Sequence, residues 1–147
     1  VAMHIRAGDK AMNVGSDRLG VNQNVTERMM NCAQNWADAA GMNDAIFLVV
    51  ADSEEVKRFA ASWSPGRVFT SRTLPFHTDR SRGPEKLAGT IGSWVDIFLL
   101  ALADAVVLSP SGFGLSAASI GMFPDTHILN YRECPRYTKK LAKAGNG

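Results

Sequence analysis

Seven consecutive apolar residues, Ala-Ile-Phe-Leu-Val-Val-Ala at 45–51, limit the folds that are open to this chain. A short apolar run that is rich in branched side chains is typical of a strand buried on both faces. Such strands occur in parallel sheets that helices cover on both sides. Four further short runs predict strands, at residues 1–6, 67–71, 105–108 and 126–130.

The segments between these runs alternate between helical patterns and polar loops. Apolar residues near the helical period predict a helix over 24–40, with Gly41 as its C-cap, and a second helix from Ser53 to about Trp63. A third helix carries one apolar stripe at offsets 0, 3, 4, 7, 8 and 11, formed by Ile91, Trp94, Val95, Phe98, Leu99 and Leu102. A fourth helix is expected over 115–122, and loops are expected over 7–22 and 72–88.

This order of elements predicts an α/β fold with a Rossmann-like parallel sheet flanked by helices. Residues 1–147 are expected to form a single domain, because no linker or repeat interrupts them. The chain opens at Val1, directly inside an apolar run, so we expect it to be a fragment of a longer polypeptide. The tryptophans Trp36, Trp63 and Trp94 are expected in the core.

Composition argues against several kinds of partner. The net charge is only +2, which favours neither nucleic acid nor a membrane surface, and no apolar run is long enough to span a bilayer. The two cysteines, Cys32 and Cys134, follow no metal-ligand spacing. We expect two buried free thiols, with a disulfide as the alternative. Residues 24–26 form an N-glycosylation sequon, Asn-Val-Thr.

Polar side chains follow four of the predicted strands, and in a parallel sheet such positions gather at the carboxyl edge, where ligands bind. Arg6 can grip a phosphate through paired hydrogen bonds, and a Ser-rich turn before a helix offers hydroxyl and N–H groups to an anion. No dinucleotide fingerprint and no P-loop is present. The edge therefore predicts a nucleotide site of another pattern, formed by His4, Arg6, Gly8, Asp9, Asp52, Ser109, Ser111, Gly112 and Phe113.

Four ordered segments together resemble the GDP-fucose-dependent fucosyltransferases of the α1,6-, plant xyloglucan and protein O-fucosyltransferase kinds. Residues 4–9, His-Ile-Arg-Ala-Gly-Asp, resemble the His-x-Arg-x-Gly/Thr-Asp motif of that family. Residues 47–52 resemble its second strand, which ends in an acidic residue. Residues 96–104 resemble its helix before the fourth strand, and residues 109–114 resemble its Ser-rich turn. The chain has Ala7 and Ser53 where the α1,6 branch has a second Arg and a second acid, so α1,6 acceptor chemistry is not implied.

The resemblance implies one half of a GT-B fold, the carboxyl-side domain that holds the GDP-sugar, with the amino-terminal domain of the same chain missing. Its implied activity is transfer of L-fucose from GDP-fucose to a glycan or protein hydroxyl, without a metal. Arg6 would be the catalytic residue that stabilises the leaving diphosphate. His4, Gly8 and Asp9 would line the nucleotide site, Asp52 would touch the nucleoside, Asp96 would hold the guanine or order the site, and the 109–113 turn would cradle the diphosphate. The implied compartment is the Golgi or endoplasmic reticulum lumen for a eukaryotic full-length enzyme, and otherwise the cytoplasm.

Simpler interpretations stay open for each of these residues. Arg6 and Asp9 can form an ion pair at a strand end, Asp52 can be only a helix N-cap, and Asp96 can be a solvent-exposed residue off the apolar stripe. The 111–114 segment can be an ordinary turn. His77 and Asp79 can be an acid/base pair or part of a polar loop. At the level of the whole chain, the alternatives are a nucleotide- or carbohydrate-binding module without catalysis and a flavodoxin-like regulatory domain.

Overall fold

The computed structural model describes residues 1–7, 19–73, 83–109, 111–124 and 128–130. Five strands, all parallel, form one sheet in the order β3-β2-β1-β4-β5. Four helices connect them in alternation. The elements are β1 (Ala2–Ile5), α1 (Leu19–Ala39), β2 (Phe47–Ala51), α2 (Glu54–Trp63), β3 (Val68–Thr70), α3 (Gly83–Ala101), β4 (Val106–Leu108), α4 (Gly112–Gly121) and β5 (Ile128–Asn130). The predicted Rossmann-like α/β sheet is confirmed.

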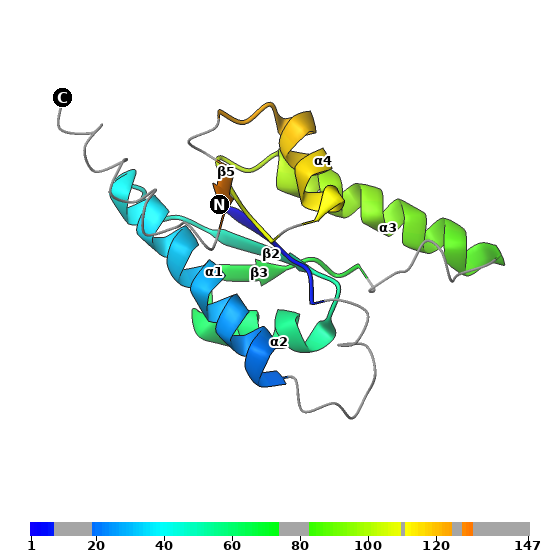
Figure 1. Ribbon diagram of the computed structural model, residues 1–147, viewed down its shortest axis with the longest axis horizontal. Helices are drawn as coiled ribbons and strands as arrows, with labels where there is room; N and C mark the ends of the chain where they lie inside the picture. The colour runs from blue at the N-terminus through cyan, green and yellow to red at the C-terminus, as the bar shows by residue number, and fades with distance from the viewer. Residues whose placement is uncertain (8–18, 74–82, 110, 125–127, 131–147) are drawn as a thin grey trace.

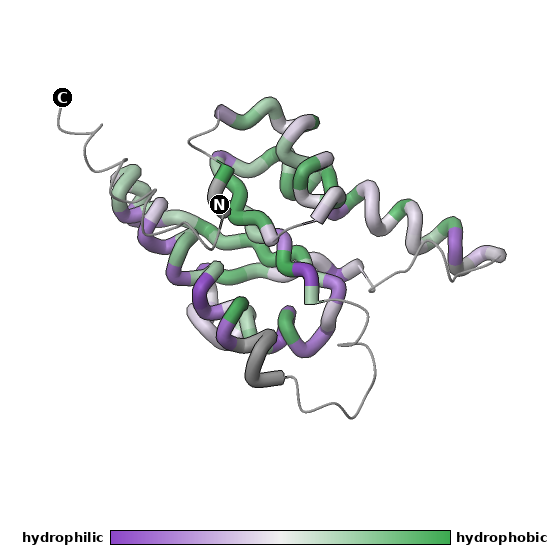
Figure 2. The backbone as a smooth tube through the Cα atoms, viewed as in Figure 1, coloured by the Kyte–Doolittle hydropathy of each residue, from purple (hydrophilic) through white to green (hydrophobic). Residues whose placement is uncertain are grey.

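Helices cover both faces of the sheet, with α1 and α2 on one side and α3 and α4 on the other (Figure 1). The strands divide their side chains with the period of two that this arrangement requires. Met3, Phe47 and Val49 pack into the core under α1 and α2, whereas Ala2 and Val50 pack under α3 and α4. The hydrophobic segments in Figure 2 accordingly run through the central strands.

Local signals fix two helix boundaries. At the end of α1, Met42 N donates to Ala37 O (2.9 Å) and Gly41 N donates to Asp38 O (3.1 Å), while Gly41 has a φ of 72°. This is a Schellman ending with glycine at the left-handed position, and it confirms the prediction that Gly41 ends the helix. At the start of α2, Ser53 is the N-cap, and its Oγ accepts from Val56 N.

Three helices begin earlier than predicted, and the differences are largest for α1 and α3. α1 begins at Leu19, inside the expected loop 7–22, and α3 begins at Gly83, inside the expected loop 72–88. Because Gly20 and Asn22 are poor helix formers, the sequence did not predict the first turn of α1. Adding a turn to an existing helix nevertheless requires little free energy. In α3, Pro84 suits a first helical turn and Leu87 continues the apolar stripe one turn back from Ile91, a signal that the sequence did contain.

The apolar stripe of α3 faces outward, which corrects the expected core position of Trp94. Trp94 and Phe98 are each 52% exposed, and Leu102 is 84% exposed. The opposite side of the helix packs on the sheet through Ile97 and Leu100. Trp36 is buried as predicted, and Trp63 is half-buried against the core.

The prediction of free thiols is wrong, because Cys32 is disulfide-bonded. Spacing along the chain does not report which side chains meet in the fold, so the sequence left this bond as an alternative. Cys134 lies outside the described residues. In the sequon, Asn24 is exposed on α1 and Thr26 is fully buried.

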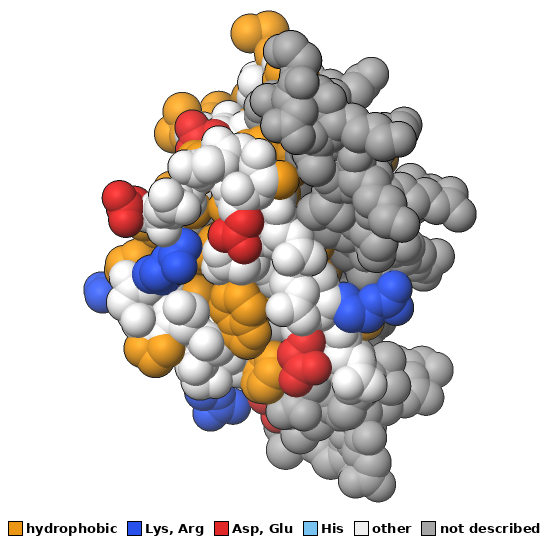
Figure 3. Space-filling view, turned by 90° about the vertical axis from the view of Figure 1, so that its left-hand side faces the viewer, with side chains coloured by type: hydrophobic (Ala, Val, Ile, Leu, Met, Phe, Trp, Pro, Cys, Tyr) orange, Lys and Arg blue, Asp and Glu red, His pale blue; other side chains and the backbone are white. Residues whose placement is uncertain are grey.

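The side of the molecule shown in Figure 3 carries acidic and basic side chains interspersed, without a large area of one sign on its described part. Within the described ranges, no helix is both long and apolar enough to cross a membrane.

Candidate functional site

The segments that leave β1 and β4 are joined at the carboxyl edge of the sheet. His4 lies opposite Leu108 in the parallel ladder, and Ser109 N donates to His4 O (3.0 Å). Directly after the end of β1, Arg6 N donates to the Ser109 hydroxyl (2.9 Å). Ser109 is buried, so its hydroxyl fixes the point at which Arg6 leaves the sheet. The structure thus brings together three of the predicted site residues.

Asp52, which follows β2, binds the two residues that follow β1. Its Oδ1 accepts from Ala7 N (2.6 Å), and its Oδ2 lies 3.1 Å from Arg6 Nε. Hydrogen bonds to a charged group of this kind are worth about 1.5–3 kcal/mol. Asp52 is therefore no helix N-cap, since Ser53 fills that position. The side chain of Arg6 keeps 42% of its surface exposed, so an anion can reach it.

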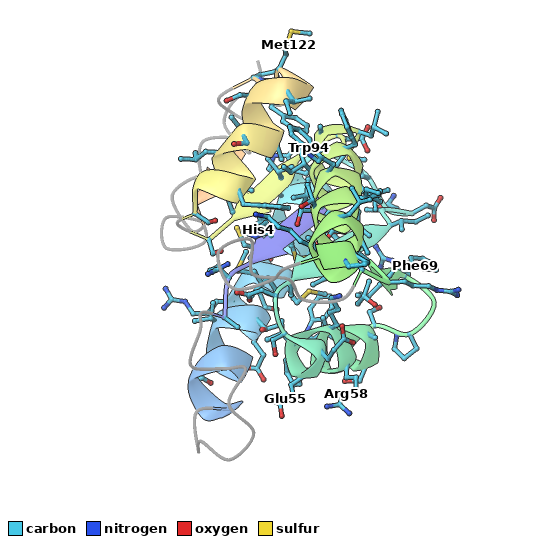
Figure 4. All side chains as sticks on the ribbon, turned by 90° about the vertical axis from the view of Figure 1, so that its right-hand side faces the viewer. His4, Glu55, Arg58, Phe69, Trp94 and Met122 are labelled. Carbon is cyan, nitrogen blue, oxygen red and sulfur yellow. The ribbon has the colours of Figure 1, made fainter. Side chains whose placement is uncertain are left out.

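His4 (labelled in Figure 4) lies on β1, the middle strand of the sheet, two residues before Arg6. Its ring stacks on Phe113 with the centroids 4.9 Å apart. Burial, and to a smaller extent Arg6, lower the pKa of His4 from 6.5 to about 4, although Asp52 acts in the opposite direction. The imidazole is consequently neutral near pH 7. Its Nδ1 is buried and has no hydrogen-bond partner among the described residues.

Gly114 explains how α4 approaches His4 so closely. A Cβ at this position would lie 3.2 Å from His4 Nδ1 and 3.1 Å from Leu108 Cδ2, closer than most real Cβ contacts. Only a residue without a side chain fits there without displacing a neighbour. Gly114 was the last residue of the predicted Ser-rich turn, but its packing role had no signal in the sequence.

The Ser-rich turn becomes the start of α4. Ser111 is the N-cap, and its Oγ accepts from Phe113 N (3.2 Å). Gly112 is exposed in the first turn. An ordinary cap and an anion-binding helix start use the same geometry, because the first N–H groups of a helix lack partners within it.

Asp96, on α3, is buried rather than exposed, which corrects the solvent-exposed interpretation. Only 7% of its surface is accessible, and its Oδ2 accepts from Thr73 Oγ1 (2.6 Å). Its Oδ1 is buried without a hydrogen-bond partner among the described residues. Ser71, which follows β3, lies 3.1 Å from Thr73 through their hydroxyl oxygens. Asp96 thus faces the chain that leaves the third strand.

Lys57 and Thr73 belong to this cluster, although the sequence did not single them out. Lys57 is 3% exposed, and its Nζ donates to Thr73 O and to Glu54 Oε1. A lysine in an amphipathic helix normally lies in solvent, so no sequence signal marked it as buried.

Several predicted residues lie outside the described ranges, namely Gly8, Asp9, His77 and Asp79. The proposed Arg6–Asp9 ion pair therefore stays a prediction, and the structure pairs Arg6 with Asp52. Among the residues that the structure describes, no three His, Cys, Asp or Glu side chains gather to hold a metal ion.

Comparison with protein-family models, with curated proteins and with solved structures finds no match for this chain. The resemblance to fucosyltransferases consequently depends on the motif residues themselves.

Proposed function

We propose that this chain is the donor-binding half of a GT-B glycosyltransferase and holds GDP-fucose at the carboxyl edge of its sheet. One observation carries the proposal. Arg6 is fixed between Ser109 and Asp52 by contacts of 2.9–3.1 Å, and its side chain remains accessible. An oriented and accessible guanidinium beside a helix start is suited to a diphosphate.

Asp52 has a different role from the one that the resemblance implied. Both of its carboxylate oxygens already have partners directly after β1: one accepts from Ala7 N, and the other pairs with Arg6. We therefore assign Asp52 to positioning the guanidinium rather than to contacting the nucleoside.

The nucleoside would lie against His4 and Phe113. The stacked rings of His4 and Phe113 are uncharged near neutral pH and suit the flat surface of a base or ribose. We assign Asp96 to ordering the site rather than to holding the guanine, because its carboxylate is buried and its Oδ2 accepts from Thr73 Oγ1.

In the proposed reaction, an acceptor hydroxyl attacks the anomeric carbon of fucose, and the bond from that carbon to the β-phosphate oxygen breaks. The leaving GDP gains negative charge, which Arg6 and the start of α4 stabilise where it develops. The hydroxyl proton passes to a base outside this chain, in the second domain that a GT-B enzyme requires.

Calorimetric titration of the chain with GDP and GDP-fucose tests the proposal. Arg6→Ala is expected to weaken binding by about 2 kcal/mol, or roughly thirtyfold, through loss of a charge-assisted contact. The matched control is Arg58→Ala, which removes the same charge from an exposed position on α2 (Figure 4). Equal affinities for the two variants, or no binding by the folded wild-type chain, would contradict the proposal.

Turnover with an acceptor, in a chain that includes the second domain, separates an enzyme from a binding module. Fucose transfer that Arg6→Ala abolishes is expected. Binding without transfer would favour a module that has lost catalysis.

A further inference from the structure

The outer side of α3 is a continuous apolar stripe that nothing in the described structure covers. It consists of seven large side chains that are each 37–84% exposed, namely Leu87, Ile91, Trp94, Val95, Phe98, Leu99 and Leu102. The rings of Trp94 and Phe98 lie together, with their centroids 6.1 Å apart. In Figure 1, the first turns of α3 extend beyond the other described helices and strands.

The area of this stripe is that of an interface rather than of an ordinary surface. With about 200 Å² for a large apolar residue, the exposed fractions amount to roughly 800 Å². The largest apolar patch on a typical monomer is about 300–600 Å², whereas each side of a stable protein interface buries about 800 Å².

Charge narrows the choice of partner. Between Leu87 and Leu102, the only charged residue is Asp96, which is buried on the opposite side of the helix. The stripe therefore has no charged group with which a charged peptide could form an ion pair. Lys86 is the only Lys or Arg within α3, whereas an amphipathic helix held on a lipid surface is rich in Lys and Arg along its polar face.

The spacing of the stripe suits a second helix. Leu87, Ile91, Trp94 and Phe98 follow one another at intervals of four, three and four residues, which is the pattern of a coiled-coil seam. This seam complements itself when two copies run antiparallel about a two-fold axis at Trp94 and Val95. Leu87 then lies opposite Leu102 of the partner subunit, and Ile91 lies opposite Phe98 of the partner subunit.

We propose that two copies of this chain dimerise through α3, in an antiparallel helix pair built on this stripe. The interface is isologous, since each copy contributes the same residues. It leaves β1, β4 and the start of α4 outside the contact, so the dimer does not depend on the proposed nucleotide site.

Sedimentation velocity over the micromolar range tests the dimer. Phe98→Glu is expected to raise the dissociation constant at least about thirtyfold, as for a residue at the centre of an interface. Phe69→Glu is the matched control, because Phe69 is also 52% exposed but lies on β3. Leu102→Glu gives a second disrupting variant at a position that is 84% exposed, where folding tolerates a charge.

A monomeric wild-type chain at the highest concentration would overturn the proposal, and so would a dimer that Phe98→Glu and Leu102→Glu leave intact. Crosslinking tests the orientation. Leu87→Cys mixed with Leu102→Cys is expected to form a disulfide between subunits, whereas Leu87→Cys linked to itself would indicate a parallel pair and contradict the antiparallel arrangement.

Discussion

Replacing Gly114 with Ala tests whether α4 is held against His4 as closely as the structure indicates. The new methyl would lie 3.2 Å from His4 Nδ1 and 3.1 Å from Leu108 Cδ2. Forcing an extra methyl group into a packed core costs about 1–3 kcal/mol. The same substitution at Gly112, in the same turn of α4, meets nothing within 4 Å.

Comparing the two glycine variants isolates the contribution of the steric clash to the free energy of unfolding. Ala is favoured over Gly in a helix by about 0.5–1 kcal/mol, and this gain is common to both variants. Gly114→Ala is therefore expected to be less stable than Gly112→Ala by about 1–3 kcal/mol, the cost of the clash alone.

Urea denaturation followed by circular dichroism measures this difference, with equal m-values as the check that both variants unfold in the same way. In a His4→Ala background, Gly114→Ala is expected to cost less stability than it does in the wild-type chain, because the ring that the methyl meets is gone. Equal stability of Gly112→Ala and Gly114→Ala would refute the packing of α4 on His4.

Two further predictions concern stability. Folding lowers the pKa of His4 from 6.5 to about 4, so the fold has its full stability above pH 6.5, and the free energy of unfolding falls by about 3 kcal/mol between pH 6.5 and 4. Urea melts at these pH values measure the loss. The same loss in a His4→Gln variant would show that other groups cause it. Reducing the disulfide of Cys32 is expected to lower the free energy of unfolding by about 2–4 kcal/mol, and dithiothreitol should leave the stability of Cys32→Ala unchanged.

The candidate site was predictable in outline but not in its pairings. Strand-ending positions such as Arg6, Asp52 and Ser109 follow from apolar runs, and parallel strands bring their ends to one edge. The order of the strands in the sheet decides which of these groups contact each other, and the sequence does not reveal that order. The Asp52–Arg6 pair exists because β2 lies beside β1.

The apolar period of α3 shows a second limit. The sequence predicted one stripe correctly, since periodicity reports which residues share a side of a helix. It did not report which side meets the sheet. In the structure, Ile97 and Leu100 pack inward and the stripe faces out.

Local chemistry alone determined the strands, the Schellman ending at Gly41 and the capping Ser residues, because these depend on neighbours a few residues apart. Tertiary structure decided the burial of Lys57 and Asp96, the disulfide at Cys32 and the contact of Gly114 with His4. Each of these joins segments that are distant in the sequence, so its energy exists only once the sheet has brought them together.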